Sequence, residues 1–228
     1  MGIGHLGASF ALRARFPRVP FFFLLAAGVL VDVFWGLAFL SGLEKARIDT
    51  GSGSVIPLVL EHVPFTHSLP ACLLWAALAS FGWWLWRRDR AGALVLGALV
   101  LSHWVLDLVS HVGDLPLLPA GPLVGLGLWR SRGASLVVEL GLFAVGLSLY
   151  IRGTAARDRT GSVGILIAGA VLFLGGAGAF LGPPATSVLP LAAGNLALVL
   201  VLLLLDWIDR HRTVKLARSF ETATGLSA

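Results

Sequence analysis

Long stretches of the chain carry almost no charged side chains and are close to twenty residues long. Six such stretches occur, at residues 20–43, 66–86, 91–111, 134–152, 162–182 and 186–208. About twenty apolar residues in a helix are enough to cross the hydrocarbon core of a bilayer. Because no water reaches that core, the backbone must satisfy its own hydrogen bonds, and a helix does so. We therefore predict an all-α, polytopic membrane helix bundle with about six transmembrane helices.

The overall composition favours the same fold class. Hydrophobic residues make up 57% of the chain and charged residues 13%, which is too apolar for a soluble domain of this size. Because the apolar stretches follow one another closely, we expect residues 1–228 to form a single transmembrane domain. Within this domain, residues 1–130 are expected to carry the functional site and residues 131–228 to supply supporting helices.

The segment before the first span, residues 4–16, is only about half as long as a transmembrane helix, and two placements are open for it. It can be a re-entrant helix inside the bundle, where protein covers the irregular backbone at its tip. It can instead be an amphipathic helix on the membrane surface. The first placement brings His5 to the middle of the membrane beside Asp32, and the second leaves His5 in water.

Basic residues are distributed unequally over the two sides of the predicted bundle. If the N-terminus lies inside, the inner segments hold thirteen Lys and Arg residues and the outer segments hold four. This excess follows the positive-inside rule, which accounts for the net charge of +5 without a role in binding nucleic acid. We predict a bacterial inner (cytoplasmic) membrane protein with both termini in the cytoplasm.

Ionisable residues inside the predicted spans are the main indication of function. His103, Asp107 and His111 follow one another at intervals of four in the third span, so on a continuous helix they form one stripe. Such groups cost several kcal/mol when they face lipid, so the stripe must face a partner or a polar cavity. Asp32 lies at mid-depth in the first span and His67 begins the second. These positions converge on the outer half of the bundle.

Imidazole nitrogens and carboxylate oxygens are the ligands that zinc and similar divalent ions take. We predict one or two divalent ions, with zinc as the first choice. The candidate ligands are His5, Asp32, His62, His67, His103, Asp107 and His111. Seven donors exceed the needs of one ion, so either two ions share them or some donors orient the ligating imidazoles from a second layer.

Three carboxylates are candidates for a catalytic general base, namely Glu61, Glu139 and Asp107. Two ions a few ångströms apart suit phosphoester hydrolysis, because they hold the attacking water and stabilise the leaving oxygen. A serine mechanism is disfavoured, since Thr66 and Ser68 are expected to cap the second span.

Residues 112–133 are apolar but rich in Pro and Gly, which excludes a regular helix. We expect this segment to rest on the outer end of the bundle and to roof the polar cluster. It can also be an interfacial loop anchored by Trp129 in the aromatic belt. Near the end of the chain, Asn195 can hydrogen-bond between helices or line the cavity, and we favour the bond between helices. We expect Asp206, Asp209 and Arg210 to form exposed ion pairs.

Several short motifs in the first 130 residues occur in the order found in a known family. In chain order they are Gly4-His5-Leu6, Asp32, His62 with Thr66-His67-Ser68, and Leu101-Ser102-His103 followed by Asp107, Gly113, Pro116 and Pro119. The pattern resembles the bacterial inner-membrane metal-dependent hydrolases described as LexA-regulated and YdjM-like, which are distantly similar to zinc-dependent phospholipase C. The resemblance implies a metal-dependent hydrolase and makes His5 one of the metal ligands.

The chain departs from this family pattern in two places. The first span carries Asp32 alone, because Phe34 stands at the second acidic position of the family's Pro-Asp-Ile-Asp. The segment from His62 to His67 lacks the family's arginine, which could contact a phosphate. His111 is an additional donor outside the usual pattern. These departures bear on the number of ions and on phosphate recognition.

The leading hypothesis is a membrane-embedded, metal-dependent hydrolase that acts on a lipid or lipid-linked phosphoester, or a related ester, from the outer leaflet. A metal-ion or proton-coupled transporter is an alternative, because buried His and Asp chains also serve as relays. A transporter is expected to carry polar residues along the inner halves of the same helices, which here are nearly all Leu, Ala, Val and Trp. A metal-stabilised membrane scaffold without turnover is the third possibility. The expected partners are the membrane and its lipids, and the oligomeric state is not indicated.

Overall fold

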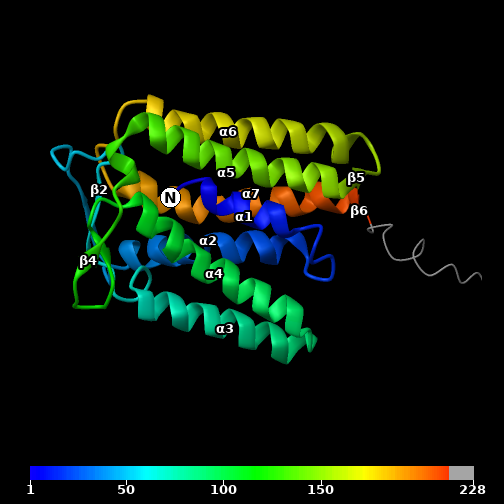
Figure 1. Ribbon diagram of the computed structural model, residues 1–228, viewed down its shortest axis with the longest axis horizontal. Coiled ribbons are helices and arrows are strands. Elements are labelled where there is room, and N and C mark those ends of the chain that lie inside the picture. Colours follow the sequence, from blue (N-terminus) through cyan, green and yellow to red (C-terminus); the bar gives the residue numbers. More distant parts are fainter. Residues whose placement is uncertain (216–228) are drawn as a thin grey trace, which may run out of the picture.

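The computed structural model describes residues 1–215 as a bundle of long helices with small two-stranded β-sheets at its two ends (Figure 1). Six helices in this part are long and apolar enough to cross a membrane. They are α2 (Phe21–Leu40), α3 (Leu69–Arg87), α4 (Arg90–Ser110), α5 (Arg132–Gly153), Thr160–Leu181, which comprises the π-helical turn Thr160–Gly164 and α6 (Ile165–Leu181), and α7 (Leu189–Arg210). The predicted all-α membrane bundle is therefore confirmed. Residues 216–228, which include Arg218 of the charge count and the C-terminus, lie outside the described residues.

The short helix α1 (Gly4–Leu12) lies inside the bundle, where it packs against α2, α4 and α5. Two glycines allow its backbone to touch that of α5. A Cβ atom on Gly7 would lie 2.5 Å from the carbonyl oxygen of Leu142, and one on Gly146 would overlap the carbonyl group of Gly7. His5 and Phe10 are buried on this helix. Of the two placements left open by the sequence, the structure has the one inside the bundle.

The ends of the helices follow local capping signals only in part. Ser68 caps α3 by accepting a hydrogen bond from the N–H of Ala71, with Pro70 in the first turn. Ser131 caps α5 in the same way through Ala134. Thr66, which was expected to act as a cap, instead makes side-chain contacts that belong to the candidate site.

Two antiparallel hairpins lie at one end of the bundle, which we call the hairpin end (Figure 1). The first joins β1 (Lys45–Ile48) to β2 (Leu58–His62), and the second joins β3 (Leu115–Pro116) to β4 (Leu123–Val124). A 3₁₀ turn, Leu128–Arg130, leads from the second hairpin into α5. The segment 112–133 is thus irregular and covers the end of the bundle, as the sequence predicted. The first hairpin was not predicted.

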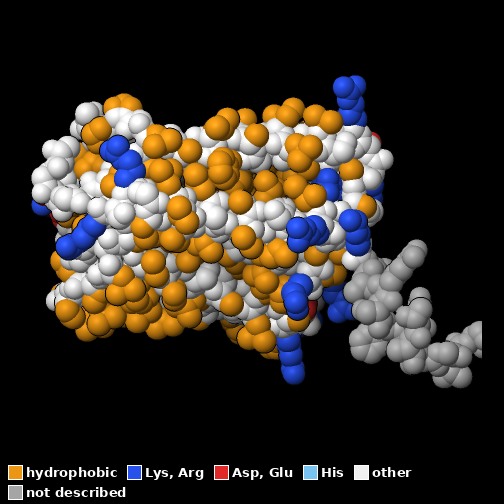
Figure 2. Space-filling view, turned by 45° about the horizontal axis from the view of Figure 1, so that its top comes forward, with side chains coloured by type: hydrophobic (Ala, Val, Ile, Leu, Met, Phe, Trp, Pro, Cys, Tyr) orange, Lys and Arg blue, Asp and Glu red, His pale blue; other side chains and the backbone are white. Residues whose placement is uncertain are grey.

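The opposite end of the bundle carries most of the basic residues, as Figure 2 shows. This basic end contains the α1–α2, α3–α4 and α5–α6 connections and the small sheet of β5 (Thr154–Ala156) with β6 (Arg212–Val214). In the described bundle, the end formed by the predicted inner segments is therefore more basic than the end formed by the predicted outer segments, as expected from the sequence.

The expectation of exposed ion pairs near the end of α7 holds only in part, because Asp206 pairs with the exposed Arg210 at 2.7 Å but both aspartates are buried. Asp209 accepts hydrogen bonds from Arg13 Nε at 2.9 Å and from the Tyr150 hydroxyl at 2.8 Å. Asp206 accepts one from the backbone N–H of Phe22 at 3.0 Å. The reason is that the last turns of α7 pack against other chain segments and do not face water. These bonds hold α1, α2 and α5 to α7 at the basic end.

Candidate metal centre

A single cluster gathers five of the seven predicted metal donors. The five are His5 from α1, Asp32 from α2, His67 from the turn before α3, and His103 and Asp107 from α4. They form two overlapping sets of three, one with His5, His103 and Asp107 and one with Asp32, His67 and His103. Within each set the ligand atoms lie within 4.8 Å of one another. Four separate chain segments thus meet at one point.

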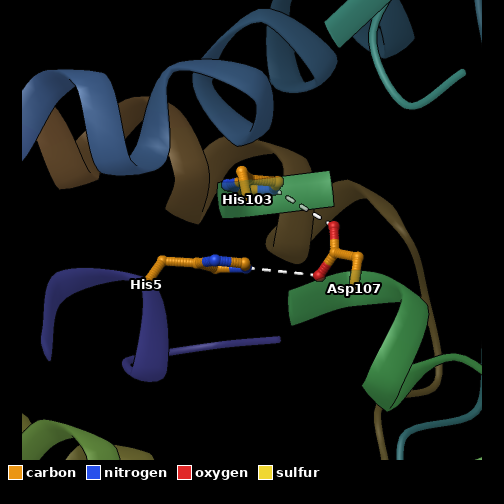
Figure 3. Close-up of side chains that lie close together, drawn as sticks. All are labelled: His5, His103 and Asp107. Atoms are coloured by element: carbon orange, nitrogen blue, oxygen red, sulfur yellow. Dashed lines mark ion pairs between the residues drawn. The ribbon is translucent and has the colours of Figure 1, made fainter. Parts of the chain in front are cut away.

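Asp107 lies beside two stacked imidazoles and directs one carboxylate oxygen at each (Figure 3). Its Oδ1 atom is 3.2 Å from His5 Nε2, and its Oδ2 atom is 3.2 Å from His103 Nε2. The rings of His5 and His103 are stacked, with centroids 3.7 Å apart and planes 6° apart. The amino group of Met1 also contacts Oδ1. The two histidines therefore present the same ring nitrogen to one carboxylate.

His67 and Asp32 complete the cluster on the other side of His103. His67 Nε2 lies 3.8 Å from Asp32 Oδ1 and 3.8 Å from Asp107 Oδ2, and His103 Nε2 is also 3.8 Å from Asp32 Oδ1. The Asp32 side chain is 23% exposed, whereas that of His103 is fully buried. Asp32 is therefore the donor most open to the cavity beside the cluster.

The donors fit a divalent ion in their chemistry and in their unsatisfied atoms. Among residues 1–215, the buried Nε2 atoms of His5 and His103 lie 3.2 Å from Asp107 but make no hydrogen bond. Buried polar atoms without a partner are rare in proteins and ask for an explanation. Imidazole and carboxylate donors are the set that zinc prefers. Bound to an ion, these nitrogens would be satisfied.

His103 is oriented by the backbone of α2. Its Nδ1 atom lies 3.0 Å from the carbonyl oxygen of Gly28. A carbonyl oxygen can only accept, so Nδ1 must carry a proton, and in the neutral ring Nε2 then keeps its lone pair. Such a contact behind a ligating histidine fixes both the tautomer and the ring direction.

His67 is oriented by a buried pair that the sequence did not reveal, Glu44 and Thr66. Glu44 is 1% exposed and accepts hydrogen bonds from the N–H groups of Phe65 and Thr66. The Thr66 hydroxyl lies 2.6 Å from Glu44 Oε2 and 2.9 Å from His67 Nδ1. Because the hydroxyl gives its only proton to the carboxylate, it must accept from His67 Nδ1. His67 Nε2 is thereby left free for the cluster.

A cavity of about 310 Å³ adjoins the cluster near the hairpin end. Asp32, His67 and Asp107 line it from the cluster. The other lining residues are Met1, Gly2, Ile3, Trp35, Ile56, Leu58, Leu60, His111, Trp129, Glu139, Gly175, Gly176, Ala179, Phe180, Leu191 and Asn195. Asn195 therefore lines the cavity, which the sequence had ranked below a bond between helices. The lining from α5, α6 and α7 shows that the second half of the chain contributes to the site directly.

His111 lies in the cavity wall but outside both donor sets. Its Nδ1 atom is 2.9 Å from Asp114 Oδ1, and its ring is 4.5 Å from that of Trp129. Burial alone would raise the pKa of Asp114, but the bonds from His111 and from the Leu60 N–H outweigh it and lower this pKa below its usual value. Asp114 is thus a carboxylate that holds the His111 ring.

Glu139 also lines the cavity, and it comes from α5. Its Oε2 atom accepts a hydrogen bond from the Gly2 N–H at 2.7 Å, and Oε1 accepts one from Trp129 Nε1 at 3.2 Å. Trp129 is 6% exposed. Trp129 is therefore part of the cavity wall, and the alternative of an exposed belt anchor does not hold.

Glu61 and His62 lie away from the cluster. Both are exposed on β2, and Glu61 pairs with Arg47 Nε at 3.0 Å. The pairing of β2 with β1 holds His62 opposite Lys45 at the exposed end of the first hairpin. The preceding residue, Leu60, faces inward and lines the cavity, which turns Glu61 outward because successive strand residues point to opposite sides. The structure thus places neither the predicted base Glu61 nor the predicted ligand His62 at the site.

These features define a polytopic helical membrane protein with a buried cluster of histidines and aspartates beside a cavity. The profile of the YdjM inner membrane protein family matches residues 6–181, and the chain belongs to this family. The matched region contains four of the five clustered donors, all except His5. No curated protein and no solved structure matches the chain. Family membership makes this an inner membrane protein.

Proposed function

We propose that this protein is a metal-dependent hydrolase embedded in the inner membrane, acting on a lipid or lipid-linked phosphoester or a related ester. The observation that carries the proposal is the convergence of five imidazole and carboxylate donors at the wall of a cavity within the bundle. Ionisable groups at such depth are costly and are retained where they serve a function. We propose zinc as the ion, because of the three imidazole donors.

A bound divalent ion would supply the Lewis-acid activation of water and of the scissile ester. His5 and His103 do not line the cavity, so they would hold the ion from the side away from it. The other three donors, Asp32, His67 and Asp107, would face the substrate. The two oxygens of Asp107 face different histidines, so this carboxylate can serve one ion or bridge two. The five donors are thus sufficient for one ion or for two.

His111 is the first candidate for proton transfer in the cavity. Asp114 holds its Nδ1, so Nε2 is left to accept or donate a proton at the substrate. Glu139 is the second candidate, although both its oxygens already accept hydrogen bonds. Asp107 is surrounded by nitrogen donors at 3.2 Å and serves better as a ligand than as a base.

The outer leaflet is the proposed side of access. The positive-inside rule places the basic end in the cytoplasm, which puts the hairpin end and the cavity near it on the outer side. The described N-terminus does not lie at the basic end, where the sequence had predicted it, because Met1 is buried in the bundle and lines the cavity beside Asp107. The apolar walls and the depth of the cavity favour an amphiphile over a soluble metabolite.

A packed aromatic layer disfavours the transporter alternative. Phe10, Phe21, Phe143 and Tyr150 are fully buried and contact one another with ring centroids 5.1–5.7 Å apart. This layer separates the cluster from the basic end along α1 and α5. A transport pathway needs polar or water-filled passage on both sides of the site.

The test is hydrolysis by the purified, zinc-loaded protein of a panel of phospholipids and lipid phosphates, followed by mass spectrometry of the products. We expect cleavage of at least one lipid that is lost in metal-stripped protein and in His103→Ala. A fully loaded protein that cleaves nothing but moves zinc into vesicles would show that transport is the function. A loaded protein that does neither would support the scaffold.

A further inference from the structure

The wall of the cavity is divided into a polar and an apolar side. Asp32, His67 and Asp107 form the polar side with His111 and Glu139. The lining from α6 and the start of α7 consists of small and apolar residues, except for Asn195 of α7. The small and apolar residues are Gly175, Gly176, Ala179, Phe180 and Leu191. A ligand that fills the cavity therefore needs a polar part and a hydrocarbon part.

The apolar side of the cavity reaches the surface of the bundle. Gly175 and Ala179 line the cavity and are also exposed. A Cβ atom on Gly175 would meet no described atom within 4 Å, whereas one on Gly176 would meet Ile3 at 2.5 Å. The neighbouring Leu174 is 69% exposed, as expected for a side chain that faces lipid. The cavity is thus continuous with the lipid-facing surface at the glycine positions of α6.

An indole donor in the cavity wall has no acceptor. Trp35 lines the cavity and is 2% exposed, yet its Nε1 makes no hydrogen bond within residues 1–215. An indole N–H can only donate, and burying it without an acceptor is costly. Trp104 has the same unpaired N–H but does not line the cavity. The Trp35 N–H is thus available to an oxygen acceptor on a ligand in the cavity.

We propose that a membrane phospholipid enters the cavity sideways between α6 and α7. The beginning of one acyl chain lies along Gly175 and Ala179, and an ester or phosphoryl oxygen accepts the hydrogen bond of Trp35 Nε1. A cavity at the small end of the usual range of about 300–1,000 Å³ holds only the head region, so the rest of the lipid stays in the bilayer. The inference rests on the proposed function for the identity of this lipid as the substrate, but binding itself needs no turnover.

Photolabelling tests the entry route. The zinc-loaded protein is placed in nanodiscs that contain phosphatidylglycerol with a diazirine near the carboxyl end of one chain. Labelled peptides are then located by mass spectrometry. We expect labelling at the buried wall residue Trp129, and a decrease of about tenfold or more in Gly175→Leu, because the added side chain fills the entrance. Gly178→Leu is the matched control, since Gly178 also has open space around it but does not line the cavity; its labelling should equal that of the wild type.

A second pair of variants tests the indole donor. Trp35→Phe removes the N–H and keeps an aromatic ring. Unlabelled phosphatidylglycerol, added to compete with the probe, should then reduce the labelling of Trp129 only at about fivefold higher concentration. This factor corresponds to the loss of one hydrogen bond. Trp104→Phe, which removes an unpaired indole N–H elsewhere, should leave the competition unchanged. Bound zinc, measured by elemental analysis, should be equal in all four variants and verifies that the cluster has formed.

The outcomes separate the two proposals. Equal labelling of Trp129 in Gly175→Leu and Gly178→Leu overturns the entry route, and equal competition in the two tryptophan variants overturns the role of Trp35. Labelling that depends on Gly175, in a protein that cleaves no lipid, overturns the hydrolase and keeps the lipid site. Lipid cleavage that Gly175→Leu leaves unchanged overturns the entry route and keeps the hydrolase.

Discussion

His5 and His103 stack face to face at 3.7 Å and direct Nε2 at opposite oxygens of Asp107. One ring comes from a short helix before the first span and the other from a full span. The donor set of His5, His103 and Asp107 therefore forms only when α1 is docked in the bundle. This dependence connects metal binding with the packing of α1.

The first prediction concerns the ligand set. His103→Ala removes the donor shared by both sets of three, so we expect metal content to fall from about one ion or more per chain to a small fraction. His62→Ala removes an exposed imidazole outside the cluster and should leave metal content unchanged. Elemental analysis of the purified proteins measures both. Full metal content in His103→Ala would mean that the ion binds elsewhere.

The second prediction concerns the residues behind His67. Thr66→Val removes the hydroxyl between Glu44 and His67 Nδ1, which should weaken zinc affinity about 10–100-fold, as for other contacts that orient metal ligands. Thr66→Ser retains the hydroxyl and should restore the affinity. Competition with a chromophoric chelator measures the affinity, and circular dichroism checks the helical content. An unchanged affinity in Thr66→Val would remove Glu44 and Thr66 from the site.

The third prediction concerns the docking of α1. Gly7→Ala places a methyl group 2.5 Å from the Leu142 carbonyl oxygen, which cannot move away easily because it belongs to the α5 backbone. We expect a loss of about 1–3 kcal/mol in stability, typical of an overpacked contact, together with weaker metal binding through His5. Thermal unfolding in detergent, with and without zinc, measures both effects.

Gly141→Ala is the matched control for Gly7→Ala. Gly141 lies on α5, and a Cβ atom there meets no described atom within 4 Å. Alanine favours a helix by about 0.5–1 kcal/mol over glycine, so this variant should be as stable as the wild type or slightly more stable. If Gly7→Ala behaved like Gly141→Ala, the close contact between α1 and α5 would not be present in the protein.

The fourth prediction separates a catalytic His111 from a ligating one. If the hydrolase proposal is right, His111→Gln should retain its metal and lose about 10²–10⁴-fold in kcat, the usual contribution of a general acid or base. Glu61→Gln alters an exposed carboxylate that pairs with Arg47 and should keep full activity. Parallel assays of zinc content and lipid cleavage give the answer. Loss of metal in His111→Gln would return His111 to the ligand set that the sequence predicted.

Several parts of the site were predictable because they depend on one helix alone. His103 and Asp107 share a face because residues four apart on a helix always do. His111 continues that spacing in the sequence, but α4 ends at Ser110 and His111 has extended backbone angles, with ψ at 151°. The stripe therefore stops one residue short of His111, which turns to Asp114. Periodicity predicts a face only as far as the helix continues.

Other residues could not be found in this way. Glu44 follows the first span in a loop, where an acidic residue is ordinarily solvated, and only the fold beside Thr66 buries it. Trp35 is an apolar residue in an apolar span, and its unpaired N–H matters only because the cavity lies beside it. Asp209 was expected in water because nothing local signals its contacts with Arg13 and Tyr150.

The sequence by itself determined the membrane bundle, the limits of its spans to within a few residues, and the pair of donors on α4. These are local properties, since apolar content and helical spacing are decided within twenty residues. Only the tertiary structure decided that α1 lies inside the bundle, that five donors meet while His62 and His111 do not join them, and that α6 and α7 form a cavity wall. Those outcomes depend on contacts between distant segments, such as Gly7 against Leu142, whose fit no single stretch of sequence contains.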